Sequence, residues 1–151
     1  MALIQIAMKN AKPSARITAR RSAGSDHEVI TVEVDGGAGL YRREPCARCP
    51  WRIDQTGVFP AEAFRHSANT AYDMAQETFA CHESGAKKPA ICAGFLLRGA
   101  EHNLSIRLKL SKREIAPDEV GDGGHALHSD YRAMAIANGV PPADPALVRC
   151  R

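Results

Sequence analysis

Four cysteines in the middle of the chain carry the clearest chemical signal in the sequence. Cys46 and Cys49 form a Cys-x-x-Cys pair; 31 residues separate Cys49 from Cys81, and ten separate Cys81 from Cys92. A Cys-x-x-Cys pair supplies two thiolates from one turn, and two distant thiolates complete the tetrahedron that a structural metal ion requires. The spacing therefore predicts one metal site formed by all four residues.

The residue types leave the identity of the metal open. Zinc and a 4Fe-4S cluster both accept four thiolates. Pro50 after Cys49 is typical of cluster ligands, whereas the two long gaps match no ferredoxin spacing. His82, next to Cys81, could replace one sulfur in a zinc site or lie beside the ligands. We expect zinc, with the 4Fe-4S cluster as the alternative.

Catalytic motifs are largely missing. Residues 45–49 match Pro-Cys-x-x-Cys, half of the zinc deaminase signature, but the His-x-Glu half is missing upstream because His27 and Glu28 are adjacent. Four sulfur ligands would also leave no open position for a catalytic water. We therefore do not expect an enzyme, and we expect no small-molecule substrate.

Basic side chains flank the cysteines, with one tryptophan among them. A basic surface with a stacking aromatic suits nucleic acid, whereas Trp51 could instead pack over the metal site. A host protein is the alternative partner. The candidate partner-binding residues are Arg42, Arg43, Arg48, Trp51, Arg52, Lys87 and Lys88.

Length and composition predict one small folded domain over residues 1–151. Apolar residues make up 44% of the chain and aromatic residues only 5%, so a metal ion would reinforce a core of small aliphatic side chains. The net charge of +3 does not by itself indicate nucleic acid. The longest apolar run, residues 90–97, is too short to span a membrane, and the first residues lack the features of a signal peptide. We expect a cytoplasmic protein, in which thiols stay reduced.

The elements around the cysteines predict an α+β fold, with a short N-terminal β-hairpin followed by three to four helices. Residues 29–34 are β-branched and should form a strand, with a turn at 35–37 and a return strand at 40–41. Residues 3–8 could form another short strand. Residues 9–26 are basic and lack apolar periodicity, which predicts a mobile segment, and residues 141–151 form a proline-rich tail with Cys150 exposed.

Helix signals follow the first cysteine pair. Pro60 should open a helix that ends near Gln76, and Pro89 should open a second helix over residues 90–98. Residues 104–112 alternate between apolar and polar side chains, as in a strand, but their Leu, Arg and Lys content favours a helix, which Asn103 could cap. We favour the helix. A last helix should begin at Ser129 and end at the Asn-Gly-Val-Pro sequence of residues 138–141.

Three motifs resemble an uncharacterised family of small four-cysteine proteins from phages, prophages and actinobacteria. They are Cys-x-x-Cys-Pro-Trp-Arg, Phe-Ala-Cys-His-Glu-Ser and Cys-Ala-Gly-Phe-Leu-Leu, with Asn103 and Arg107 further on. The resemblance covers about residues 46–107 and implies a shared metal-binding fold without an assigned reaction. The Cys-x-x-Cys-Pro piece is also similar to part of the WhiB-type cluster-binding regulators, whose other cysteines are spaced differently.

Taken together, the sequence predicts a phage-type metal-binding accessory protein. Its four-cysteine site would organise a surface that binds nucleic acid or a host protein. One alternative is an iron–sulfur regulator that responds to redox conditions, and a second is an inhibitor of a host defence complex.

Overall fold

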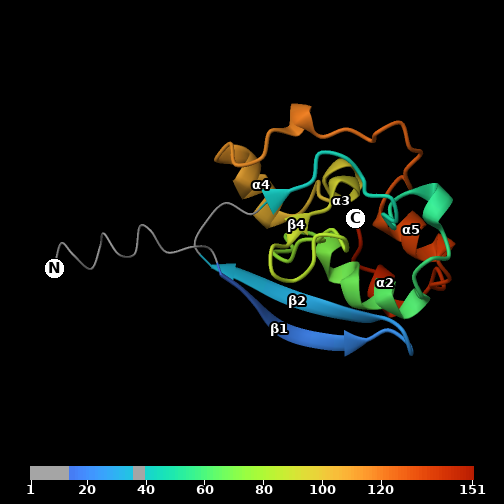
Figure 1. Ribbon diagram of the computed structural model, residues 1–151. Helices are drawn as coiled ribbons and strands as arrows, with labels where there is room; N and C mark the ends of the chain where they lie inside the picture. The colour runs from blue at the N-terminus through green and yellow to red at the C-terminus, as the bar shows by residue number, and fades with distance from the viewer. Residues whose placement is uncertain (1–13, 36–39) are drawn as a thin grey trace, which may run out of the picture.

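The computed structural model describes residues 14–35 and 40–151. A two-stranded hairpin lies along one side of a body built from short helices and loops (Figure 1). This arrangement confirms the expected α+β class, with an N-terminal hairpin and then four helices in the described residues. The helices are α2 (Ala61–Ser67), α3 (Ala93–Arg98), α4 (Leu104–Ser111) and α5 (Tyr131–Ala137).

The hairpin pairs different segments from those expected. The strand predicted over residues 29–34 is confirmed as β2 (Glu28–Asp35), but its antiparallel partner is β1 (Ser14–Ser22). We had expected residues 9–26 to lack regular structure. The expected strand over residues 3–8 and the glycines of the expected turn lie outside the described residues.

The charged residues of β1 explain why this strand was not predicted. Arg16 Nη2 lies 2.6 Å from Glu33 Oε2, and Arg20 pairs with Glu28, so both ion pairs cross from one strand to the other. Opposite charges on facing strands contribute about 0.2–1 kcal/mol per pair. A basic segment that looks solvated in the sequence is therefore balanced by acidic residues of the neighbouring strand.

The expected return strand at residues 40–41 has another partner. It forms β3 (Leu40–Tyr41), which pairs in parallel with β4 (Ala90–Ile91). Ile91 of β4 also forms an antiparallel bridge with Ala80, so β4 has a paired segment on each side. We had expected residues 90–92 to be helical. The two-sided pairing holds them extended, and the helix begins only at Ala93.

The first helix is shorter than predicted. α2 ends at Ser67, and the short 3-10 helix η2 (Ala68–Ala71) follows it. Tyr72 is extended and bridges Cys150, and Met74 has a positive φ of 60°, so the chain leaves the helical conformation well before Gln76.

The ends of the later helices follow the sequence signals closely. The helix predicted over residues 104–112 is confirmed as α4, and the Asn103 side chain accepts a hydrogen bond from the backbone N–H of Ile106 at 3.1 Å. α5 is capped by Asp130 rather than Ser129. Gly139, with a φ of 99°, ends it as predicted. No helix of the described ranges is both long and apolar enough to cross a membrane. Three further 3-10 helices are η1 (Ile53–Gln55), η3 (Pro117–Glu119) and η4 (Pro145–Leu147).

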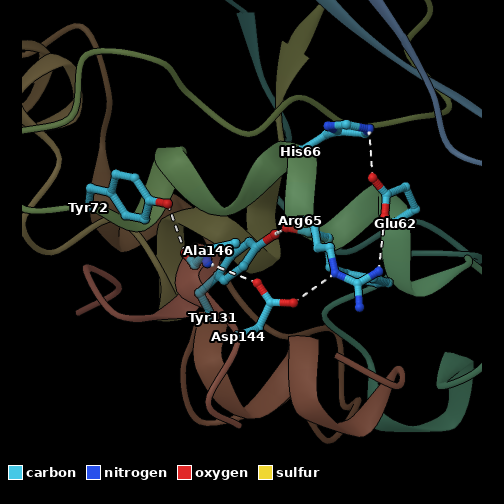
Figure 2. Close-up of polar contacts among 8 residues, drawn as sticks. Glu62, Arg65, His66, Tyr72, Tyr131, Asp144 and Ala146 are labelled. Atoms are coloured by element: carbon cyan, nitrogen blue, oxygen red, sulfur yellow. Dashed lines mark hydrogen bonds and ion pairs between the residues drawn. The ribbon is translucent and has the colours of Figure 1, made fainter. Parts of the chain in front are cut away.

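The C-terminal residues pack against the domain. Leu147 is completely buried, and the Tyr72 hydroxyl donates a hydrogen bond to the carbonyl of Ala146 at 2.8 Å (Figure 2). Cys150 is half-buried, with its Sγ 3.7 Å from the carbonyl oxygen of Ala68, and burial raises the pKa of its thiol to about 11. The expectation of an exposed Cys150 was therefore wrong.

One ion pair fastens this segment to α2. Arg65 Nε lies 2.8 Å from Asp144 Oδ2 and Arg65 Nη1 lies 2.9 Å from Glu62 Oε2, while Asp144 Oδ1 accepts the backbone N–H of Ala146 (Figure 2). The hydrogen bond from Arg65, followed by that from the Ala146 N–H, lowers the pKa of Asp144. Its ionised form is therefore stabilised by folding.

This ion pair predicts a loss of stability in acid. Because the pKa of Asp144 is lowered in the folded state, its contribution is complete above the unfolded value of about 4 and is lost as the pH falls through the folded value. Wild type should therefore melt at a higher temperature than Asp144→Asn near pH 6, and the gap should close in acid. Thermal melts across pH measure this. Asp118→Asn, at an exposed carboxylate that makes no ion pair with any described residue, should show no gap. A gap for Asp144→Asn that persists to pH 2 would contradict the prediction.

Candidate metal centre

Cys46 and Cys49 are presented by one tight turn. The backbone N–H of Cys49 donates to the carbonyl of Cys46 at 3.1 Å, and the N–H of Arg52 donates to the carbonyl of Cys49 at 3.1 Å. Pro50 lies between these two hydrogen bonds and donates none of its own. The turn thus directs two sulfurs from neighbouring positions toward the interior, where both side chains are buried.

Cys81 and Cys92 are placed by backbone pairing between their segments. The N–H of Cys81 donates to the carbonyl of Ala90 at 2.7 Å, and the N–H of Cys92 donates to the carbonyl of Phe79 at 2.9 Å. Ser84 closes the intervening loop, because its Oγ donates to the Cys81 carbonyl and accepts from the Ala90 N–H. No sequence pattern indicates this role of Ser84 beyond its place in the loop.

The structure brings together the four cysteines that the spacing had grouped. Cys49 Sγ lies 3.6 Å from Cys92 Sγ, and the Cys46 thiol interacts with those of both Cys49 and Cys81. All four are at most 5% exposed and belong to the main core cluster. Two remote parts of the chain therefore meet at one buried group of sulfurs. Metal binding by this group stays a prediction.

Neighbouring sulfurs influence one another's pKa in the order Cys81, Cys46, Cys49 and Cys92. Sulfurs around one tetrahedral zinc ion lie about 3.8 Å apart, given a Zn–S distance of about 2.3 Å. The 3.6 Å contact between Cys49 and Cys92 matches that separation. Among the described residues, however, the one group of three donors with all separations within 4.8 Å is Cys46, His82 and Glu83. To form a four-sulfur tetrahedron, the sulfurs of Cys81 and Cys92 would need to move inward.

The thiols of Cys46, Cys49 and Cys81 are held in their neutral form when no cation is bound. The hydrogen bond with Cys49, followed by burial, raises the pKa of the Cys46 thiol far above its usual value. The contact with Cys46 lowers the pKa of Cys49, but the hydrogen bond with Cys92 and burial outweigh it and raise that pKa to about 12. Burial also raises the pKa of Cys81. A bound cation would reverse this balance, so metal binding should release protons.

His82 lies at the solvent side of this group. Its Nδ1 is 3.7 Å from Cys46 Sγ, and its ring lies edge-on to Phe59 with centroids 5.2 Å apart. Burial lowers its pKa, so its neutral form, which can bind a metal, dominates at neutral pH. The geometry is compatible with His82 as a ligand or as a neighbour of the ligands.

Arg52 has a different role from the one expected. Its side chain is 11% exposed, and its Nη1 donates to the carbonyls of Cys46 at 3.3 Å and Ala47 at 3.1 Å. Asp54 holds the guanidinium from the other side through two hydrogen bonds of 2.8 and 2.6 Å. Arg52 therefore clamps the Cys-x-x-Cys turn, and its fork of donors is not free for a partner.

Removing this clamp should weaken metal binding. Arg52→Met keeps the apolar stem but loses the hydrogen bonds, and zinc affinity should fall about 10- to 100-fold, as is typical when groups that orient metal ligands are lost. Arg107→Met, at an exposed arginine on α4, is the matched control and should bind zinc as tightly as wild type. Competition with a chromophoric chelator measures both affinities. Equal affinity in all three proteins would contradict the clamp.

Trp51 cannot stack on a partner at the surface, because it is completely buried. Its ring contacts Phe79, Phe95 and Tyr131 at centroid distances of 5.9, 6.3 and 5.9 Å. Its Nε1 has no hydrogen-bond partner in the described part of the chain, which costs about 1–3 kcal/mol that its apolar contacts must outweigh. The alternative reading of Trp51, as packing beside the metal site, agrees with its position.

The remaining basic residues divide into two groups. Arg43 pairs with Glu119 at 2.9 Å and lies over the ring of Tyr41. The other four make no ion pair with any residue in the described ranges. Arg42 acts electrostatically on Cys81 and Arg48 on His82, so both lie near the cysteine group. The four are Arg42, Arg48, Lys87 and Lys88, the last three exposed.

Comparison with known proteins gives one family of unknown function (DUF6283), which matches residues 41–151. No curated protein and no solved structure matches the chain. The matched range contains all four cysteines with His82 and Arg52, whereas the β1–β2 hairpin precedes it.

Proposed function

The chain belongs to the DUF6283 family, whose function is unknown, and we propose that it is a metal-binding protein whose four-cysteine site organises a surface for a macromolecular partner. The observation that carries the proposal is the meeting of four buried thiols from two remote segments. Buried cysteines without a metal or a disulfide need no such clustering, whereas a tetrahedral ion requires it. The ligands would be Cys46, Cys49, Cys81 and Cys92.

Zinc is the metal that the contacts favour. A single zinc ion holds its sulfurs about 3.8 Å apart, whereas a four-iron cluster separates them by placing each at a different iron. The 3.6 Å contact between Cys49 and Cys92 supports the single ion. The neighbouring aromatic rings and the clamp by Arg52 would give the ion a structural role, in a reducing cytoplasm.

Elemental analysis with a visible spectrum tests the metal. Protein purified without oxygen should be colourless and contain one zinc per chain. A brown protein with several irons per chain would instead establish an iron–sulfur centre and the redox-sensitive regulator. Protein without either metal would overturn the proposal.

Nucleic acid is the partner that the charges favour. Four of the candidate partner-binding residues, Arg42, Arg48, Lys87 and Lys88, make no ion pair with any described residue and lie on the segments that carry the cysteines. A metal ion that joins those segments would therefore fix the distances between these basic side chains. Such side chains bind the phosphate backbone, and affinity then falls with salt. The resemblance to phage proteins makes a host protein, such as a defence component, the alternative partner.

Fluorescence anisotropy with DNA and RNA oligonucleotides tests the partner. We expect binding at low salt. The logarithm of the binding constant should fall linearly with the logarithm of salt concentration, with a slope of about −3 to −4 for four phosphate contacts on duplex DNA. Replacing Arg48, Lys87 and Lys88 by glutamine should weaken binding and flatten this slope. Lys112→Gln, at an exposed cation directly after α4, is the control. No binding at low salt would remove nucleic acid and favour the host protein.

A further inference from the structure

Cys46 belongs to two candidate ligand sets at once. Its pKa depends on the neighbouring thiols of Cys49 and Cys81, and its Sγ also lies 3.7 Å from Nδ1 of His82. The donor atoms of Cys46, His82 and Glu83 all lie within 4.8 Å of one another. Thiolate, imidazole and carboxylate are the three donor types that zinc accepts in proteins. Cys46 thus joins the buried group of sulfurs to a second, mixed group of donors.

The two groups differ in their access to solvent. The four cysteines are at most 5% exposed, whereas His82 and Glu83 are both exposed. An ion on three surface donors keeps a position for water and exchanges readily, while four thiolates close the coordination sphere. An ion arriving from solvent therefore meets His82 and Glu83 before it can reach Cys49 or Cys92.

Charge also singles out Glu83. Arg42 and Arg48 lie close to the cysteine group, and both repel an approaching cation. Glu83 acts on both Cys46 and His82, and its carboxylate is the acidic donor within this group. The edge of the ring of Phe59 contacts the His82 ring and restricts its orientation. The mixed group therefore combines attraction for a cation with an oriented imidazole.

We propose that Cys46, His82 and Glu83 form an uptake site for a divalent metal ion, from which the ion passes to the four cysteines. This proposal rests on the metal site proposed above. During the transfer Cys46 keeps the ion, His82 and Glu83 leave it, and the other three thiols replace them. Each thiol releases its proton to solvent as it binds, and the oxidation state of the ion does not change.

Kinetics separates this role from that of a permanent ligand. An uptake donor lowers the barrier in both directions, so its loss slows binding and release by the same factor and leaves the equilibrium affinity unchanged. Loss of a permanent ligand weakens the affinity, chiefly through faster release. His82 can therefore be assigned by measuring both rates.

The test uses the full chain, freed of metal under reducing conditions, and Zn²⁺ supplied as its complex with a chromophoric chelator. Stopped-flow absorbance follows transfer to the protein and, with excess chelator, recovery from it. In Glu83→Gln and His82→Asn we expect both rates to fall at least about tenfold, with affinity unchanged within about twofold. Glu77→Gln, at an exposed carboxylate outside the group, should match wild type.

Each other outcome overturns the uptake site. Unchanged rates in both variants would do so while leaving the four-cysteine site intact. Faster release with weaker affinity in His82→Asn would make His82 a permanent ligand. If the wild-type chain takes up no zinc, the metal site itself fails, which the wild-type measurement alone reveals.

Cobalt gives an independent signature of the same path. Its sulfur-to-metal absorption grows with the number of thiolate ligands. Wild type should therefore show an early species of weak absorption, with one thiolate, before the final four-thiolate spectrum. Glu83→Gln should lose that early species. A single-phase rise in wild type would overturn the proposal.

Discussion

Replacing Cys49 by serine should abolish stoichiometric zinc binding and markedly lower the melting temperature of the chain. Cys49 is one of the two inner sulfurs of the group: it is completely buried, its Sγ lies 3.6 Å from that of Cys92, and its pKa depends on Cys46. The apparent binding free energy of a structural zinc site is about 10–16 kcal/mol at neutral pH, and it stabilises the folded state. The net stability of a folded domain is about 5–15 kcal/mol, so losing the site removes a margin of similar size.

The measurement combines zinc content with the fluorescence of the single tryptophan. Trp51 follows Cys49 by two residues and is completely buried, so unfolding around the site should shift its emission to the red. A chelator added to wild type should lower the melting temperature, followed by this emission, in the same way. Cys150→Ser is the matched control, because Cys150 is a half-buried thiol outside the group, and it should keep one zinc per chain. A Cys49→Ser protein with full zinc content and an unchanged melting temperature would contradict the prediction.

The sequence could group the cysteines because their chemistry restricts the possibilities. A Cys-x-x-Cys pair is a local signal, and Cys81 and Cys92 were the two other cysteines close enough in sequence to complete the site. The exclusion of Cys150 also agrees with the structure, since it lies against Ala68 and Ala146. Pairing between remote segments brought these residues together, and no local pattern indicates that pairing.

Elements that depend on remote partners were the ones that sequence patterns missed. β4 was expected to be helical because Pro89 suggests a helix start, but hydrogen bonds on both sides of residues 90–91 outweigh local preference. β1 was missed because its charges resemble those of a solvated segment until β2 supplies their partners. By contrast, α4 was predictable from residue preference and the cap at Asn103, both of which are local.

Two side chains near the cysteines show the same limit. Trp51 and Arg52 were grouped with the partner-binding residues by type and proximity alone. In the structure Trp51 lies in an aromatic group, and Arg52 donates to the carbonyls of Cys46 and Ala47. An aromatic or basic residue near a metal site can face inward or outward, and only the fold decides which.

The aromatic group links the cysteines to the rest of the core. Trp51 lies two residues after Cys49, Phe79 two residues before Cys81, and Phe95 three residues after Cys92. Each segment that brings in a cysteine therefore also brings an aromatic ring. The metal ion and these rings would hold the same three segments, which lets a chain with few aromatic residues form a defined interior.

The second large effect, a loss of stability, is expected from Gly94→Ala, because Trp51 packs closely against α3. Alanine normally stabilises a helix relative to glycine by about 1 kcal/mol, and Gly94 has no positive φ that would disfavour it. A Cβ at this position, however, would lie 2.5 Å from Cβ and 2.7 Å from Cγ of Trp51. Both atoms belong to a buried side chain near its backbone, so neither can swing aside.

We therefore expect Gly94→Ala to destabilise the domain by about 3 kcal/mol, the upper part of the usual range for overpacking. For a domain of this size that lowers the melting temperature by roughly 6–12 °C. Gly121→Ala is the matched control: among the described residues other than its chain neighbours, no atom lies within 4 Å of the added Cβ, and its φ is not positive, so its melting temperature should stay near that of wild type. Because Trp51 follows the Cys-x-x-Cys pair closely, Gly94→Ala should also weaken zinc binding, whereas Gly121→Ala should not. A Gly94→Ala protein as stable as wild type would mean that Trp51 does not occupy the space above α3.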